Sequence, residues 1–370
     1  MTAAALVGVL LLLVALLGGT PTSATAAAEP VSYAQTRHTR PSIGRHPFLS
    51  RLQLGALLAN TTPQVDPFGG LPPGDLPPPT PAACGRRLAG TAHTVLCGAA
   101  PPLGGIVLVP PRRATASVVF LHGYTNTPAV YLTLLRALLS SAPDAWASTR
   151  WVVPFAPRVP VQLFDSPVRG PYAWFDPTPS LTGSLADLLG GATPDAPAVE
   201  RGLLAATEDV DRLGLFFSTR RVEALIAAEH RVLGGGRGRG RGPPPAGRVV
   251  LLGHSLGGAM AAHVALQSRA RLTAVVSLQG FVPDARRLAR VPGTYEDHHR
   301  RGYPVELVAG AEDATAPPPL IAASAAIVRR LLRGVARVRY TALPRVTHWS
   351  FFFQRADADA VVGVLLRYLG

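Results

Sequence analysis

The sequence contains no lysine, so its 36 basic residues are all arginine, against 22 acidic residues. The formal net charge of +14 is of the size found in nucleic-acid-binding proteins. Aromatic residues make up only 6% of the chain, however, and the arginines are scattered instead of forming a stripe with stacking rings. We therefore interpret most arginines as solvated surface residues and expect no specific nucleic-acid partner.

One low-complexity tract keeps a second hypothesis open. Gly234–Ala246 (GGGRGRGRGPPPA) contains an arginine–glycine repeat of the kind found in RNA-binding segments. The tract is short and isolated between a predicted helix and a predicted strand, so we favour a surface-loop insertion. An arginine-rich nucleic-acid-binding protein is the alternative that this tract and the net charge support.

Cysteine is also scarce, and the chain has only Cys84 and Cys97. Two cysteines allow a single intramolecular bridge, and neither lies near a histidine in a way that suggests a cysteine nucleophile. In an exported chain we expect the two to pair and to close a small loop ahead of the core. Two buried thiols are the alternative.

Long apolar runs are lacking outside the N-terminus. Ala3–Leu17 is apolar, and an A-x-A site follows at Ala26–Ala28, which in length and cleavage chemistry is typical of a secretory signal peptide. We predict a signal peptide over residues 1–28 and a protein that is secreted or enters the secretory pathway. The charged n-region is missing, so an uncleaved anchor is the alternative, although the run is short for a membrane span. We expect no transmembrane segment after signal removal.

Residues 29–103 are poorly periodic and rich in proline and glycine, which predicts an N-terminal extension. Asn60 in this extension starts an N-glycosylation sequon that only a eukaryotic secretory route would use. From residue 104 to residue 370, predicted strands alternate with predicted helices. Because such alternation requires crossover connections, we predict one α/β domain with a mostly parallel central sheet and helices on both faces.

The predicted elements begin with a hairpin formed by Thr94–Leu96 and Gly105–Val109. Further strands are predicted at Ser117–Leu121, Arg150–Val153, Arg248–Leu252, Leu272–Leu278, Pro304–Ala309 and Arg337–Ala342. Helices are predicted at Ala129–Ser140, Val199–Gly214, Ser218–Leu233, Gly257–Ser268, Pro318–Leu332 and Asp357–Leu369.

The stretch VVLLGHSLGGAM, Val249–Met260, contains a candidate nucleophile. Gly-x-Ser-x-Gly alone is weak evidence in a chain with 37 glycines. Here it lies between an apolar run typical of a strand covered on both faces and a small-residue helical pattern. A sharp strand-to-helix turn lifts a serine oxygen out of the sheet, and its strain requires glycine neighbours. We therefore predict that Ser255 is a nucleophile.

A serine nucleophile needs a base and an orienting carboxylate, which in a sheet of this type follow in the order Ser, Asp or Glu, His. Asp313 and His348 each follow a later predicted strand, and among the later histidines His348 alone obeys this order. Glu312 is the competing acid, or else a solvated turn residue. We predict a triad of Ser255, Asp313 and His348.

The first long strand ends in a His-Gly pair, which allows a loop backbone to approach the serine. We predict that the backbone N–H groups of Tyr124, in this loop, and of Leu256 form an oxyanion hole. His122 is expected to brace the loop and not to react.

Six stretches of the chain resemble the phospholipase/carboxylesterase family of α/β-hydrolases, which includes acyl-protein thioesterases. They are FLHGY (Phe120–Tyr124), AWFDP (Ala173–Pro177), LLGHSLGGAMA (Leu251–Ala261), SLQGFVP (Ser277–Pro283), GAEDATAPP (Gly310–Pro318) and VTHWS (Val346–Ser350). AWFDP is the most diagnostic, because the general chemistry of hydrolases does not require it. The resemblance covers Gly104–Leu369 and implies the α/β-hydrolase fold, a Ser-Asp-His triad, and neither a cofactor nor a metal.

The chain departs from the family pattern at three places. His254 and Leu256 replace a phenylalanine and a glutamine, Thr125-Asn126 replaces a Gly-Asp, and Ala316-Pro317 replaces a Val-Pro. The elbow GHSLGG also occurs in lipases. The hydrolase class follows from the resemblance, whereas thioesterase activity is left open.

The expected function is hydrolysis of carboxylic ester or thioester bonds of acyl substrates, of the carboxylesterase, lysophospholipase or acyl-thioesterase type. The expected partner is a small acyl ester or thioester, with lipids included. The alternative is a catalytically inactive hydrolase-fold protein that binds a ligand or partner. The complete set of Ser255, Asp313 and His348 argues against that alternative.

Overall fold

The computed structural model describes residues 84–98, 103–124, 126–157, 172–177, 196–208, 210–234, 248–268, 270–290, 302–333, 336–350 and 354–369. The predicted signal peptide, Asn60, most of the predicted extension and nearly all of the arginine–glycine tract lie outside these residues. Among the helices in these ranges, none combines the length and the apolar composition that crossing a bilayer requires.

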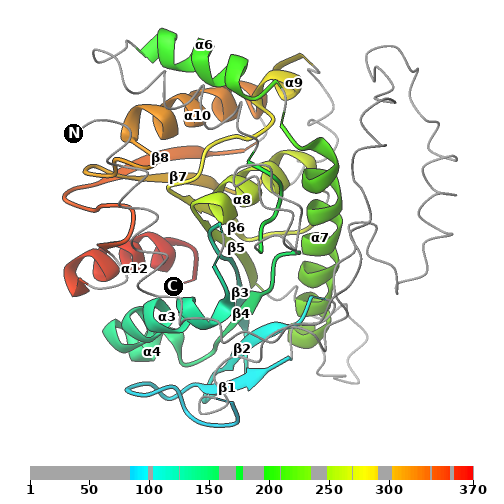
Figure 1. Cartoon of the computed structure of the whole chain (residues 1–370). Coiled ribbons are helices and arrows are strands. Elements are labelled where there is room, and N and C mark those ends of the chain that lie inside the picture. Colours follow the sequence, from blue (N-terminus) through cyan, green and yellow to red (C-terminus); the bar gives the residue numbers. More distant parts are fainter. Residues whose placement is uncertain are drawn as a thin grey trace, which may run out of the picture. The chain divides into compact units, whose positions relative to one another are not determined.

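The strands form one sheet in the order β1-β2-β4-β3-β5-β6-β7-β8 (Figure 1). They are β1 (Thr94–Cys97), β2 (Gly105–Val109), β3 (Ala116–Leu121), β4 (Thr149–Pro154), β5 (Arg248–His254), β6 (Ala274–Leu278), β7 (Val305–Gly310) and β8 (Val338–Leu343). β2 pairs antiparallel with β1 and with β4, and every other neighbouring pair is parallel. The predicted hairpin and the mostly parallel sheet are confirmed.

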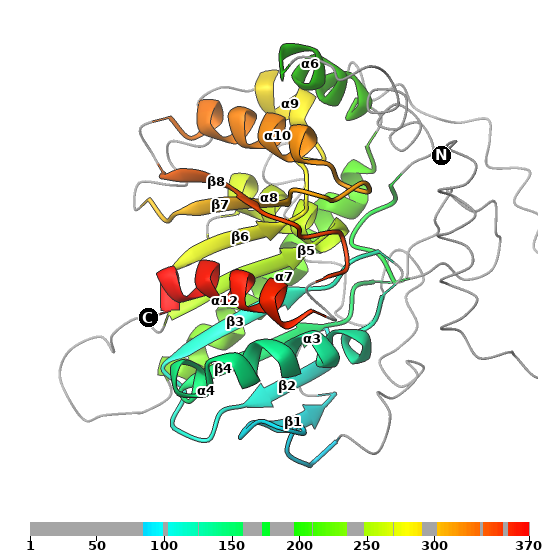
Figure 2. The ribbon, with the colours of Figure 1, turned by 90° about the vertical axis from the view of Figure 1, so that its left-hand side faces the viewer.

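Helices cover both faces of the sheet (Figure 2). One face packs against α3 (Pro128–Ser141), α4 (Pro143–Trp146) and α12 (Arg355–Leu369), and the other against α7 (Arg212–Gly234), α8 (Leu256–Gln267) and α10 (Pro318–Leu331). α6 (Ala196–Ala206) and α9 (Ala285–Arg290) pack against α10.

The central strands are apolar at successive positions because each of their faces meets a separate core. In β3, Val118 and Phe120 belong to the core under α3 and α12, whereas Val119 and Leu121 belong to the core under α7 and α8. All four side chains have no exposed surface. Side chains alternate between the two faces of a strand, so a strand buried on both sides reads as a continuous apolar run.

The predicted break between two helices is wrong, because the sequence places it between Gly214 and Ser218. The sequence predicts a helix over Val199–Gly214, but α6 ends at Ala206 and α7 begins at Arg212. Asp211 determines the start of α7, because its Oδ1 accepts a hydrogen bond of 2.8 Å from the Gly214 N–H. Its other oxygen accepts one of 3.0 Å from the Asp176 N–H. Asp211 is thus the N-cap residue of α7 and also makes a tertiary contact with Asp176. Helical periodicity in the sequence does not reveal this contact. The short helices α4 and α9 were not predicted either.

The expected pairing of the two cysteines is present in the structure. Cys84 and Cys97 form a disulfide with a Cα–Cα separation of 5.6 Å. Cys97 is the last residue of β1, at the edge of the sheet. The bridge thus closes a small loop ahead of the parallel strands, as the sequence predicts.

Candidate active site

Ser255 occupies a sharp turn between β5 and α8. Its backbone has φ 55° and ψ −122°, a region that a residue with a side chain occupies only under strain. Two hydrogen bonds hold the turn: the Ser255 N–H donates to the Leu278 carbonyl, and the Ala259 N–H donates to the Ser255 carbonyl, both at 2.9 Å. Ser255 is half-buried, so the residue is partly accessible to solvent at the carboxyl end of β5.

The glycines on either side of Ser255 are required by close backbone contacts. A Cβ atom built on Gly253 would lie 2.0 Å from the Gly257 carbonyl oxygen. A Cβ atom built on Gly257 would lie 2.1 Å from the Leu121 carbonyl oxygen, at the end of β3. Both distances are far inside van der Waals contact, so the strand and the helix can meet at this angle only with glycine at both positions.

The structure brings the three residues of the predicted triad together. His348 Nε2 lies 3.0 Å from Ser255 Oγ, and His348 Nδ1 lies 2.8 Å from Asp313 Oδ2. Asp313 is 2% exposed and His348 is 5% exposed. The residues come from three turns at the carboxyl ends of β5, β7 and β8, the edge at which parallel α/β sheets bind ligands.

Asp313, and not Glu312, is the carboxylate that contacts His348. The second carboxylate oxygen of Asp313 accepts hydrogen bonds from the N–H groups of Thr315 (2.8 Å) and Ala316 (2.9 Å). Both oxygens are therefore occupied, and the carboxylate is fixed relative to the imidazole. The Glu312 side chain is exposed, as expected of a solvated turn residue.

His122 holds the loop after β3 through hydrogen bonds at both of its ring nitrogens. Its Nδ1 bonds the Gly123 carbonyl at 2.9 Å, and its Nε2 accepts a hydrogen bond of 3.0 Å from the Ala156 N–H. Burial lowers the pKa of His122 to about 4, so the ring is neutral at neutral pH. The Trp174 indole donates to the His122 carbonyl at 2.9 Å, which gives the AWFDP stretch a structural function. These contacts agree with a bracing role.

The two predicted oxyanion donors lie on segments adjacent to Ser255. Leu256 is the first residue of α8, where an N–H has no carbonyl acceptor inside the helix. A Cβ atom built on Gly123 would lie 3.3 Å from the Ser255 Cβ, so the loop that carries Tyr124 passes beside the serine. Burial and the negative charge of Asp176 raise the pKa of the Tyr124 phenol, which excludes it as a base. The oxyanion role of both N–H groups stays a prediction.

Three further residues at the site were not predicted: Tyr131, His254 and Gln279. His254 lies inside the serine motif, and its only signal in the sequence is that it replaces a phenylalanine of the family pattern. Tyr131 lies in α3, and Gln279 follows β6 with a positive φ of 53°. Gln279 lies in the stretch SLQGFVP, but the resemblance assigned it no role, and no sequence motif contains Tyr131. Within the described ranges, no three His, Cys, Asp or Glu side chains are grouped as metal ligands.

The sheet order and the strained serine turn after β5 define the class of the protein as an α/β-hydrolase. Residues 208–351 match the family model described as Phospholipase/Carboxylesterase. This match agrees with the resemblance of the chain's motifs to that family.

Two relatives show how far the similarity extends. The chain is 30% identical over 170 residues to "Acyl-protein thioesterase 1 homolog 2" of Dictyostelium discoideum, covering 46% of this chain and 59% of that protein. It is 29% identical over 176 residues to "Acyl-protein thioesterase 1" of Cryptococcus neoformans var. neoformans, and this match covers 47% of this chain and 58% of that protein. The chain thus matches less than two thirds of the length of these relatives.

Solved structures of similar fold include acyl-protein thioesterase 2 of Zea mays. It has 21% sequence identity and a TM-score of 0.49, and the match covers 71% of this chain and 98% of that one. SOBER1 of Arabidopsis thaliana has 18% sequence identity and a TM-score of 0.47, and the match covers 70% of this chain and 100% of that one. Similarities of this size carry no argument about the chemistry of this chain.

Proposed function

We propose that this protein is a serine hydrolase that cleaves carboxylic ester or thioester bonds of acyl substrates through an acyl-enzyme on Ser255. The observation that carries the proposal is the series of hydrogen bonds from Ser255 Oγ to His348 and from His348 to Asp313, at 3.0 Å and 2.8 Å. The match of residues 208–351 to the phospholipase/carboxylesterase family model supports this bond class.

In the proposed mechanism, Ser255 Oγ attacks the acyl carbonyl while His348 Nε2 takes the hydroxyl proton. The Nδ1–H of His348 donates to Asp313, which holds the ring in the tautomer that leaves Nε2 free to act as a base. The negative oxygen of the tetrahedral intermediate would bind the N–H groups of Leu256 and Tyr124. His348 then returns the proton to the leaving alcohol or thiol, and a water molecule activated by His348 hydrolyses the acyl-enzyme.

The test compares Ser255→Ala with Ser140→Ala, a control in α3 whose hydroxyl contacts only the Gly90 carbonyl among the described groups. Both variants and the unmodified protein are assayed with ester and thioester substrates of graded acyl length, and are labelled with a fluorophosphonate probe. Ser255→Ala should lose about 10⁴-fold or more in turnover, with its melting temperature retained. Ser140→Ala should keep turnover and labelling.

Two results would reject the proposal. Turnover by Ser255→Ala at the level of the unmodified protein would exclude Ser255 as the nucleophile. A folded, unmodified protein that neither reacts with the probe nor turns over any substrate would favour the catalytically inactive binding protein.

A further inference from the structure

The main chain around His348 is held by two side chains from other parts of the fold. Gln279 Nε2 donates a hydrogen bond of 2.8 Å to the Thr347 carbonyl. His254 Nε2 lies 3.1 Å from the His348 carbonyl and 3.1 Å from Gln279 Oε1. Two successive carbonyls of the loop that carries the base are thus bound by a connected pair of side chains.

The hydrogen-bond network assigns one tautomer to His254. The Gly123 N–H donates to the Tyr131 hydroxyl oxygen at 2.5 Å, which directs the hydroxyl proton to His254 Nδ1 at 2.8 Å. Nδ1 is therefore the acceptor, and Nε2 carries the proton that it donates to the His348 carbonyl and to Gln279. Burial, and then the nearby charge of His348, lower the pKa of His254, so its ring is neutral.

Gln279 adopts a strained backbone that its side-chain contacts can explain. Its φ of 53° favours glycine, yet the residue carries a long amide side chain. Strain of this kind persists where the surrounding structure requires it, and it is frequent at functional sites. Here the amide reaches both His254 and the loop before His348.

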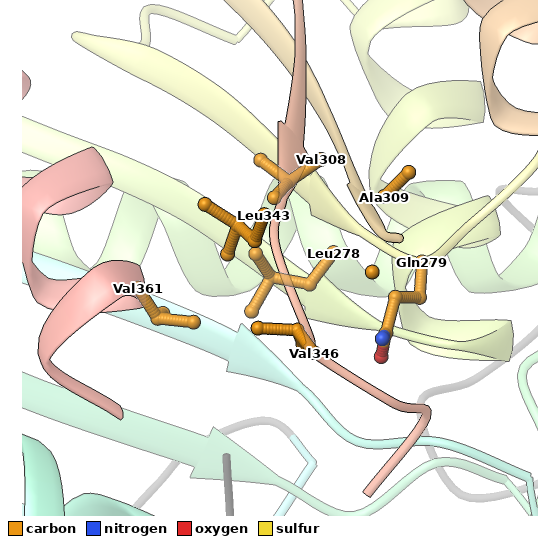
Figure 3. A pocket seen from close by; sticks show the side chains of 8 residues that line it. Leu278, Gln279, Val308, Ala309, Leu343, Val346 and Val361 are labelled. Carbon is orange, nitrogen blue, oxygen red and sulfur yellow. The ribbon is translucent and has the colours of Figure 1, made fainter. Parts of the chain in front are cut away.

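A small pocket lies beside Gln279. Figure 3 shows this residue at the edge of a small pocket between the ends of β6, β7 and β8 and helix α12. The other residues that line the pocket are mainly apolar: Leu278, Val308, Ala309, Gly310, Leu343, Val346 and Val361. Val346, which lines this pocket, belongs to the loop that carries His348.

We propose that His254 and Gln279 are positioning residues, which hold the main chain of Thr347 and His348 so that His348 Nε2 faces Ser255. The inference rests on the proposed function, since it assigns a role in orienting the base. Neither side chain has a hydrogen bond with Ser255 Oγ among the described contacts. They act on the reaction only through His348.

The first test compares His254→Leu with His254→Gln. The two replacements have similar volume, but only glutamine places an N–H donor where His254 Nε2 lies. His254→Leu should lower kcat by about 10–100-fold with little change in KM, because a misplaced base slows the chemical step and not binding. His254→Gln should recover most of this loss. If only the volume of the side chain matters, the two variants will have equal kcat.

The second test compares Gln279→Gly with Gln279→Asn. Both residues tolerate a positive φ, so the fold should persist with a melting temperature within a few degrees of the unmodified protein. Neither can reach the Thr347 carbonyl as glutamine does, so each should lower kcat about tenfold. A loss of kcat without loss of stability separates positioning from a purely structural role. A kcat within twofold of the unmodified protein in Gln279→Gly and in His254→Leu would overturn the inference.

A crystal structure of Gln279→Gly provides a result that does not depend on turnover. The separation of 3.0 Å between His348 Nε2 and Ser255 Oγ should increase beyond hydrogen-bond distance. An unchanged separation would overturn the positioning role even if the protein proved inactive. Conversely, full activity in the positioning variants combined with loss in Ser255→Ala would reject this inference and leave the proposed function intact.

Discussion

The turn that carries Ser255 and the loop that carries His348 are held in different ways. Around Ser255 the main chain packs against main chain, and Gly253 and Gly257 leave no space for a Cβ atom. Around His348 the carbonyls of Thr347 and His348 are bound by side chains, and a small pocket lies beside the loop. The serine turn is therefore held by main-chain contacts, including those with Leu121 and Leu278, whereas the loop of the base is also held by side chains from distant parts of the sequence.

The largest effect is expected from adding one methyl group at the serine turn. In Gly257→Ala the new Cβ would lie 2.1 Å from the Leu121 carbonyl, so β3, β5 and α8 cannot keep their arrangement. We expect loss of activity and a destabilisation of about 3 kcal/mol or more. Denaturant unfolding and probe labelling measure these effects.

The control for this prediction is Gly363→Ala in α12. Gly363 is exposed, and a Cβ atom there meets nothing within 4 Å. Because alanine is the better helix former, this variant should gain up to about 1 kcal/mol. If Gly257→Ala is as stable and active as Gly363→Ala, the backbone contacts do not hold the serine turn.

The next effect concerns the acid that orients the base. Asp313→Asn removes the charge that fixes the Nδ1–H tautomer of His348, so kcat should fall about 10⁴-fold. Glu312→Gln changes the neighbouring exposed side chain and should leave kcat within twofold. Steady-state kinetics on one soluble ester compare the two variants. A larger loss in Glu312→Gln would mean that the acid is wrongly assigned.

The disulfide lies outside both regions and should affect stability alone. Replacing Cys84 and Cys97 with serine should lower the free energy of unfolding by about 2–3 kcal/mol, since the bridge closes a short loop. Turnover on a small ester should persist, because the bridge is at the β1 edge of the sheet. Thermal unfolding and activity are measured on the same sample. Intact-mass analysis of the unmodified protein with alkylation should find no free thiol before reduction.

The smallest effect is expected from filling the pocket beside the base loop. Val361 lines this pocket from α12 (Figure 3), so Val361→Ile adds a methyl group where space exists and should stabilise by up to about 1 kcal/mol. Val364 is equally buried in the same helix but does not line the pocket. Val364→Ile should therefore be neutral or destabilising. Equal unfolding midpoints for the two variants would show that the pocket provides no space.

Sequence reasoning predicted the features that depend on local physics. Continuous apolar runs identified the central strands because both faces of the sheet are covered. The glycines around Ser255 indicated the turn because the Gly-x-Ser-x-Gly motif lies within five consecutive residues, between a strand pattern and a helix pattern. The order of Ser255, Asp313 and His348 followed from the chain order that triads have on sheets of this type. The structure then brought the three side chains within hydrogen-bond distance.

Other features were decided by tertiary structure alone. Asp211 begins α7 partly through its bond to Asp176, so periodicity placed the boundary wrongly. Tyr131 and His254 are separated by 123 positions, and His254 and His348 by 94. No periodicity or motif records such pairs, because their contact exists only once β5, α3 and the loop after β8 are assembled. The sequence by itself therefore determined the strands, the serine turn and the candidate triad, whereas the assembled fold decided which side chains hold the base in place.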